Sequence, residues 1–141
     1  MVRIGKISTL EILKFAEQGA YLDGGPYGEI LMPRRYVSED CVEGDDVYVF
    51  IYYDSEDRIV ASTDVPFAMV DEFAYLKVVA VTSVGAFLDW GLPKDLLVPF
   101  REQTVKMEVG KSYFVRIYVD SVTGRIVASA KFNKFLSKEI P

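Results

Sequence analysis

Short runs rich in β-branched, aromatic and aliphatic residues recur along the whole chain, and Gly, Pro and Asp separate them. Within each run apolar and polar positions tend to alternate, which is the period of a half-buried β-strand. In the first half this pattern predicts strands over Leu10–Ala16, Gly19–Asp23, Glu29–Met32, Asp46–Tyr53 and Ile59–Thr63. In the second half it predicts strands over Phe73–Val81, Gly85–Asp89, Asp95–Val98, Ser112–Val119 and Ile126–Ala130.

The two sets of strands come from an internal duplication. GAYLDGG, which starts at Gly19, is repeated as GAFLDWG, which starts at Gly85, an offset of 66 residues. With 14 identities at this offset and 5 more at an offset of 67, the second copy matches 19 of the 44 residues from Gly19 to Ser62. A period this long exceeds that of solenoid repeats. We therefore predict two small domains, residues 1–66 and 67–141.

Each copy holds five predicted strands, and the longest connection lies between the third and the fourth. This connection, Arg35–Asp45 or Arg101–Lys111, is expected to contain a short helical turn. Five strands with the long link after the third fit the OB-type barrel, and barrel closure also hides the strand edges. The predicted fold class is therefore all-β, with two tandem five-stranded OB-fold barrels.

Alternation in the repeated heptad separates an inner from an outer face. In GAFLD, Ala86 and Leu88 share one face while Phe87 and Asp89 share the other. A small residue beside a Leu suits the interior of a tight barrel, so the aromatic ring is expected to point outward. The Gly that begins the heptad follows a tight turn, where the lack of a Cβ permits a positive φ.

Charge distinguishes the two copies, although their sequences are alike. The chain has 141 residues and a net charge of −5. Residues 1–70 carry 6 Lys and Arg against 13 Asp and Glu, a net charge of −7, whereas residues 71–141 carry 10 against 8, a net charge of +2. Because nucleic acids attract basic surfaces, we expect the second copy to contribute more to any binding of a polyanion.

Missing residue types exclude several kinds of site. The chain has no His and a single Cys, Cys41. This composition excludes Ser–His and Cys–His dyads, zinc sites built on His or on several thiolates, and an internal disulfide. No apolar run approaches the ~20 residues of a membrane span, and the N-terminus lacks the apolar region of a signal peptide. We expect a cytoplasmic protein with no cofactor and no metal.

The motifs of each copy resemble the S1 RNA-binding domain, an OB-fold module. They are Gly-Ala-aromatic-aliphatic-Asp, then acidic-Leu-Leu-Val-Pro, Gly-Lys, and Asp-x-x-x-x-Arg-Ile. Two copies in tandem, with LDWG, LLVPF and KSYFVRIYVDSVTGRI, are similar more narrowly to the front half of the conserved virulence factor B (CvfB) family of bacterial RNA-binding regulators. The resemblance runs from about Gly5 to Leu136. Because that family continues into a third S1-type domain and a winged-helix domain, we expect a fragment or a short member.

The resemblance implies that single-stranded RNA binds on the face around the second and third strands, where rings stack on bases and cations meet phosphates. The residues that it assigns are the outward rings and the Asp and Arg that frame the loop after the fourth strand: Tyr21, Asp54, Arg58, Phe87, Asp120 and Arg125. The family commonly has an aromatic residue where this chain has Gln18 and Val84, and a His where it has Met32 and Val98. These departures remove stacking and hydrogen-bonding groups.

Basic residues in the loops beside the third strand are further candidates for phosphate contacts, which weaken as salt rises. Arg35 and Arg101 occupy equivalent positions, and Lys94 lies in the preceding loop of the second copy. Exposed basic residues are common in any soluble protein, and a salt bridge within the turn is the alternative for Arg58 and Arg125.

Two further aromatic features are Trp90 and a row of rings on the fourth strands. Trp90, the single Trp, stands where the first copy has Gly24, and it either anchors a base or fills a groove between the domains. A second outward stripe on the fourth strands is interpreted as a packing surface for the other domain or a partner rather than as a base platform: Tyr48, Phe50, Tyr52, Phe114, Arg116 and Tyr118.

We therefore predict a non-enzymatic protein that binds single-stranded RNA with little sequence preference and acts in post-transcriptional or virulence regulation. We expect no membrane partner and no small-molecule substrate. Paired carboxylates such as Asp23 with Glu29 are acid–base candidates, but acids at strand ends are usually solvated. The alternative function is a protein-interaction module, whose acidic first domain docks to a component of transcription or translation while RNA binds to absent C-terminal domains.

Overall fold

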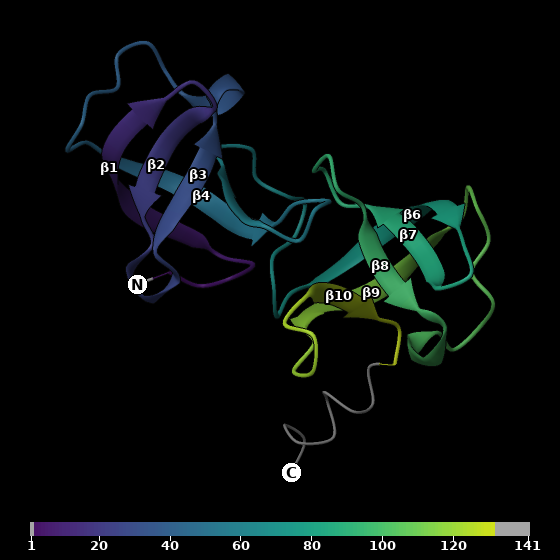
Figure 1. The fold of residues 1–141 in the computed structure, drawn as a ribbon. Helices are drawn as coiled ribbons and strands as arrows, with labels where there is room; N and C mark the ends of the chain where they lie inside the picture. Colours follow the sequence, from purple (N-terminus) through teal and green to yellow (C-terminus); the bar gives the residue numbers. More distant parts are fainter. Residues whose placement is uncertain (1, 132–141) are drawn as a thin grey trace. The chain divides into compact units, whose positions relative to one another are not determined.

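A computed structural model describes residues 2–131 and shows two closed β-barrels, one from each half of the chain (Figure 1). One compact unit ends at Val65 and the next begins at Pro66. The last part of the predicted second domain, residues 132–141, lies outside the described residues, as does the end of the resemblance at Leu136. Within residues 2–131, no helix is both long and apolar enough to cross a membrane.

The first barrel is built from five strands: β1 (Ile7–Ala16), β2 (Gly19–Asp23), β3 (Glu29–Pro33), β4 (Asp46–Tyr53) and β5 (Ile59–Ser62). Around the barrel they follow the order β1-β2-β3-β5-β4, and β4 pairs with β1 to close it. The pairing of β3 with β5 is parallel and the other pairings are antiparallel. This arrangement places β4 away from β2 and β3.

The second barrel repeats the circuit with β6 (Phe73–Val81), β7 (Gly85–Asp89), β8 (Leu96–Pro99), β9 (Ser112–Val119) and β10 (Ile126–Ser129). The predicted all-β class with two tandem five-stranded barrels is confirmed. The largest error in a strand boundary is at β1, which begins three residues before the predicted Leu10 because Ile7 already pairs with Phe50 of β4. The predicted helical turn follows the third strand directly in both copies, as 3-10 turns at Arg34–Tyr36 and Phe100–Glu102.

The repeated heptad supplies the inner and outer faces that its alternation predicted. Ala20 and Leu22 are fully buried in the core of the first barrel, and Ala86 and Leu88 are fully buried in the second. The intervening ring, Tyr21 or Phe87, is only half-buried. The two aromatic side chains therefore lie on the outer surface of their barrels, above a core of aliphatic residues.

The Asp that ends the heptad shapes the turn that follows it. The Asp23 carboxylate accepts a hydrogen bond from the amide of Gly25 at 3.0 Å, and the Asp89 carboxylate accepts one from the amide of Gly91 at 2.9 Å. Asp commonly fixes a turn through such a bond to the backbone two residues on. Asp23, weighed as an acid–base candidate, therefore has a structural role, and Asp89 has the same role in the second copy.

Candidate functional site

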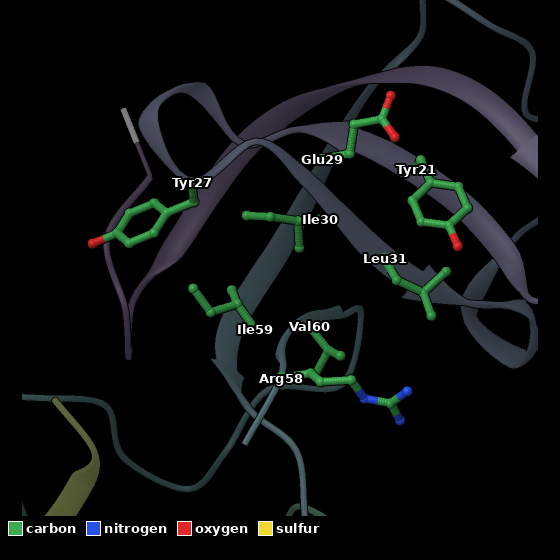
Figure 2. A pocket seen from close by; sticks show the side chains of 8 residues that line it. All are labelled: Tyr21, Tyr27, Glu29, Ile30, Leu31, Arg58, Ile59 and Val60. Carbon is green, nitrogen blue, oxygen red and sulfur yellow. The ribbon is translucent and has the colours of Figure 1, made fainter. Parts of the chain in front are cut away.

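A pocket of about 410 Å³ lies on the outer face of β2, β3 and β5 in the first barrel. Its lining combines two Tyr rings, aliphatic side chains and one residue of each charge: Tyr21, Tyr27, Glu29, Ile30, Leu31, Arg58, Ile59 and Val60. In Figure 2 Tyr21 and Arg58 lie on either side of Leu31, while the Tyr27 ring stands at the opposite end. The pocket thus has a ring, an apolar floor and a guanidinium group within one surface.

Strand register explains why these side chains meet. Tyr21 of β2 is the partner of Leu31 of β3, which is in turn the partner of Val60 of β5. Residues directly opposite one another in neighbouring strands lie on the same face of a sheet. The second barrel repeats the row, since Phe87 pairs with Leu97 and Leu97 with Val127. The duplication has therefore kept a ring–Leu–Val row on the outer face of each barrel.

Lys14 belongs to the site of the first barrel, although no motif in the sequence pointed to it. Its ammonium group lies 5.3 Å from the centre of the Tyr21 ring, a cation–π distance, and 3.2 Å from the Glu29 carboxylate. A β-bulge between Ile12 and Lys14 shifts the register and brings Lys14 opposite Tyr21. A bulge of this kind has no clear sequence signature, and in the second barrel the same shift places Ala80 opposite Phe87.

Asp54 holds the loop that presents Arg58. One carboxylate oxygen accepts hydrogen bonds from the amides of Glu56 and Arg58, at 2.8 and 2.9 Å, and the other accepts one from Arg58 Nε at 3.0 Å. Burial by itself raises the pKa of Asp54, but the hydrogen bonds from Arg58 and Glu56 outweigh it and lower that pKa below 3.8. The salt bridge considered from the sequence is therefore present, and it orients the Arg58 guanidinium group beside the pocket.

In the equivalent loop of the second barrel, Asp120 also binds an arginine from outside the loop. The Asp120 carboxylate accepts a hydrogen bond from Arg101 Nη2 at 3.3 Å and further hydrogen bonds from the amides of Val122 and Thr123. The backbone of Arg125 is bonded to Asp120 and Thr123. Asp120 thus joins the loop after β9 to Arg101, which lies in the 3-10 turn after β8.

Arg35, which is equivalent to Arg101, has a different environment. Its guanidinium group lies 4.8 Å from the Tyr36 ring and donates a hydrogen bond to the Tyr36 hydroxyl at 3.0 Å. This hydrogen bond raises the pKa of Arg35. Equivalent positions in the sequence therefore do not share one contact, because the residue after the arginine is Tyr36 in one copy and Glu102 in the other.

Trp90 is buried, with 3% of its surface exposed, and its indole nitrogen donates a hydrogen bond to the carbonyl oxygen of Lys94 at 2.7 Å. A ring with so little exposed surface offers no open face to a base, so its role in this structure is packing. Met32 and Val98 also point into their barrels, with 1% and 0% exposed. A side chain at either position therefore lies in the barrel core rather than on the outer face.

The predicted stripe on the fourth strands is only partly exposed. Tyr48 and Phe114 are 77% and 60% exposed, whereas Phe50 and Tyr52 are buried at 0% and 5%. Phe50 and Tyr52 lie outside the core cluster of the first barrel, and their rings stack with 5.9 Å between centres. Burial raises the pKa of Tyr52. Alternation alone therefore identified the outer face of this strand but not which of its rings are accessible.

Comparison with known proteins supports the relationship that the motifs indicated. The S1 domain family model matches residues 4–64 and 72–131, one match in each barrel. The uncharacterized protein YitL of Bacillus subtilis is 37% identical over 69% of this chain and 33% of its own length. Conserved virulence factor B of Staphylococcus epidermidis is 29% identical over 84% of this chain and 42% of its own length. The chain therefore spans about a third to two fifths of these curated relatives.

A solved structure shares the arrangement of the fold. It is the crystal structure of a multidomain protein with nucleic acid binding domains from Streptococcus pneumoniae. The match has a TM-score of 0.74 and 21% sequence identity, and it covers 96% of this chain and 48% of the other. At this identity the match supports the fold. With an S1 match in each barrel, the chain belongs to the S1 domain family as a tandem pair, and its predicted membership of the conserved virulence factor B family is confirmed.

Proposed function

We propose that this chain binds single-stranded RNA through the outer faces of β2–β3–β5 and β7–β8–β10. The observation that carries the proposal is the ring–Leu–Val row that both barrels keep, Tyr21–Leu31–Val60 in the first and Phe87–Leu97–Val127 in the second. A half-buried ring on an apolar floor offers its open face as a stacking surface for a base, and stacking is tolerant of sequence.

The charged side chains around the pocket support the same proposal. Lys14 and Arg58 lie on two sides of the first face, where a phosphate beside a stacked base can be reached. Their ion pairs with Glu29 and Glu56 are exposed to solvent, and exposed pairs contribute little stability, so a phosphate can replace the carboxylate. We expect contacts that follow the backbone and rings rather than base edges, hence little sequence preference.

Relatives supply a further reason for the proposal. The Streptococcus pneumoniae protein is described as having nucleic acid binding domains, and the Staphylococcus relatives are named conserved virulence factor B. We propose that this chain is a non-enzymatic binding protein that contributes to post-transcriptional or virulence regulation by binding single-stranded RNA.

The test is a binding titration with a Tyr21→Ala/Phe87→Ala double variant. Loss of two stacking rings should weaken the binding of a labelled single-stranded RNA by roughly 30-fold or more, on the scale of ~1–3 kcal/mol for each stacked base. Fluorescence anisotropy at two salt concentrations, with RNA and DNA of the same sequence, separates stacking from charge. Tyr48→Ala, which removes a 77% exposed ring of β4, is the matched control and should bind like the wild type. Unchanged affinity in the folded double variant would disprove the assignment.

A second candidate function rests on an acidic pocket of the first barrel. A hollow of about 300 Å³ is lined by the carboxylates of Glu11, Asp23 and Asp46 together with apolar groups. Within residues 2–131 no cluster of His, Cys, Asp and Glu is arranged to hold a metal ion. A Lys- or Arg-containing segment of a protein partner fits this chemistry. Binding of a basic peptide that is lost in Glu11→Gln/Asp46→Asn, with RNA affinity unchanged, would favour this candidate.

A further inference from the structure

A second set of exposed rings lies on the side of the second barrel formed by β6 and β9. Phe73, Tyr75 and Phe114 are 46%, 62% and 60% exposed. The rings of Tyr75 and Phe114 contact each other, with 4.8 Å between their centres and 51° between their planes. These rings come from strands other than β8 and β10, which carry most of the face proposed above.

Strand register places positive charge beside these rings. Reading along the β6–β9 pair, Lys77 is opposite Ser112, Tyr75 is opposite Phe114, and Phe73 is opposite Arg116. Directly opposite residues share one face of the pair. We call this surface the β6–β9 platform and define it by Phe73, Tyr75, Lys77, Phe114 and Arg116. A pair of contacting rings is thus flanked by a cation on each side.

The first barrel shows what the same surface looks like without these features. At the equivalent rows, Glu11 is opposite Asp46 and Thr9 is opposite Tyr48. The row that carries two carboxylates in the first barrel therefore carries Lys77 and an uncharged Ser in the second. One of the two contacting rings is replaced by Thr9. The two copies share a fold, but at this surface their charge has opposite sign.

From this contrast we propose that the β6–β9 platform is a second binding site for single-stranded nucleic acid. Tyr75 and Phe114 would stack on successive bases while Lys77 and Arg116 meet the phosphates on either side. Aromatic rings interleaved with cations are the combination that binds single strands without strong sequence preference. An acidic peptide would pair with the two cations, but its carboxylates would not stack on the rings of Tyr75 and Phe114. The site is separate from the Tyr21 and Phe87 faces, so either proposal can fail alone.

Acidic neighbours do not block the platform. Asp71 lies 3.2 Å from Arg116, and Glu108 lies 2.9 Å from Lys111, which precedes Ser112. Asp89 of β7 is opposite Lys77 on its other side. The Lys111–Glu108 pair is exposed on both sides, at 63% and 60%, and pairs of this kind are weak. The Arg116 side chain is only 20% exposed, but its partner Asp71 is 54% exposed, so a phosphate can approach this pair from the solvent side. In the first barrel the row equivalent to Lys77 and Ser112 pairs Glu11 with Asp46 and so offers no cation to a phosphate.

The experiment maps the binding of a labelled oligouridylate on the full chain by NMR and measures affinity by anisotropy. We expect the amide signals of β6 and β9 to shift on titration. Tyr75→Ala/Phe114→Ala should weaken binding about fivefold or more and abolish those shifts while the β2–β3 signals still move. Lys77→Gln should flatten the dependence of log affinity on log salt by about one phosphate's contribution, a slope change of ~0.7. Tyr48→Ala, at the position equivalent to Phe114, is the control and should change neither quantity.

Each outcome decides between the proposals. Shifts confined to β2–β3 and β7–β8 would overturn the platform and leave the proposed function intact. Shifts confined to β6 and β9 would support the platform and overturn the proposed faces. A platform that responds to poly-glutamate as strongly as to oligouridylate would overturn the assignment to nucleic acid. The amide spectrum of each variant, compared with that of the wild type, confirms that the barrels remain folded.

Discussion

At the scale of single residues, the first Gly of the repeated heptad is fixed by geometry. Gly19 has a φ of +150°, and a Cβ there would lie against the backbone oxygen of Met32 and 2.8 Å from the backbone nitrogen of Arg34. Gly85 has a φ of +151° and meets the backbone of β8 in the same way. Both the conformation and the close approach of the third strand therefore require glycine, which explains its retention in both copies.

Gly19→Ala is expected to destabilise the protein by more than about 2 kcal/mol, because rigid backbone atoms of β3 must move to admit the methyl group. Urea unfolding monitored by circular dichroism measures the effect. Gly44→Ala is the matched control, since Gly44 also has a positive φ, +94°, but no atom within 4 Å of the added Cβ. Its cost should be about 1–2 kcal/mol, from the backbone conformation alone. Equal costs for the two variants would contradict the role of the close approach.

The Asp54 carboxyl makes the stability of the folded protein depend on pH. Its folded pKa is lowered below 3.8, because hydrogen bonds from Arg58 and Glu56 outweigh the opposite effect of burial. A carboxyl whose pKa is lowered by folding stabilises the protein above its unfolded pKa, and that contribution is lost as pH falls through the folded value.

Asp54→Asn should therefore reduce stability near pH 7 and reduce it much less at the acidic end, below about pH 4. Thermal unfolding followed from pH 7 to pH 2.5 would show the two curves approaching each other. Asp57→Asn, in the same loop, is the control. A difference between wild type and Asp54→Asn that stays constant with pH would show that the charge of Asp54 is not what holds the loop.

At the scale of elements, β2 and β3 divide their side chains between core and surface. Leu22 is fully buried, whereas Leu31 is only half-buried and lines the pocket. The two residues have the same side chain and differ in the face on which they lie. Packing and binding are thus assigned to opposite sides of one two-stranded unit.

Leu22→Ala should cost about 2–5 kcal/mol of stability, the range for deleting a buried Leu side chain. Leu31→Ala should cost less and should lower the affinity for single-stranded RNA, because it removes the floor between Tyr21 and Arg58. Urea unfolding and anisotropy on the same two proteins measure both quantities. The reverse order of stability losses would mean that the assignment of faces is wrong.

At the scale of the whole chain, charge separates two units that share a fold. The first half has a net charge of −7 and the second a net charge of +2. The negative charge of the first half repels an approaching polyanion, although Lys14 and Arg58 lie at the pocket of the first barrel. The β6–β9 platform adds to the same asymmetry.

Phe87→Ala in the full chain should therefore weaken RNA binding more than Tyr21→Ala does at low salt. The difference should shrink as salt rises, because screening removes the unfavourable field of the first barrel. Anisotropy titrations of both variants across a salt series measure the two losses. A larger loss from Tyr21→Ala at every salt concentration would place the main binding surface on the first barrel instead.

Much of the architecture follows from the sequence by itself. The duplication and the alternation in GAYLD and GAFLD were enough to predict two five-stranded barrels, the buried Ala and Leu, and the outward Tyr21 and Phe87. These features depend on local period and on repeated motifs, which are visible in a linear chain. The sequence also showed the difference in charge between the halves, since charge needs no coordinates.

Which groups meet one another depends on the three-dimensional fold. The bulge that brings Lys14 to Tyr21, the ion pair of Arg101 with Asp120, and the burial of Trp90 depend on register and on contacts between distant strands. The contact between Tyr75 and Phe114 likewise joins residues far apart in the chain. Alternation gives each residue a face, but it does not give the neighbour across the strand, because a shift of one residue changes every partner.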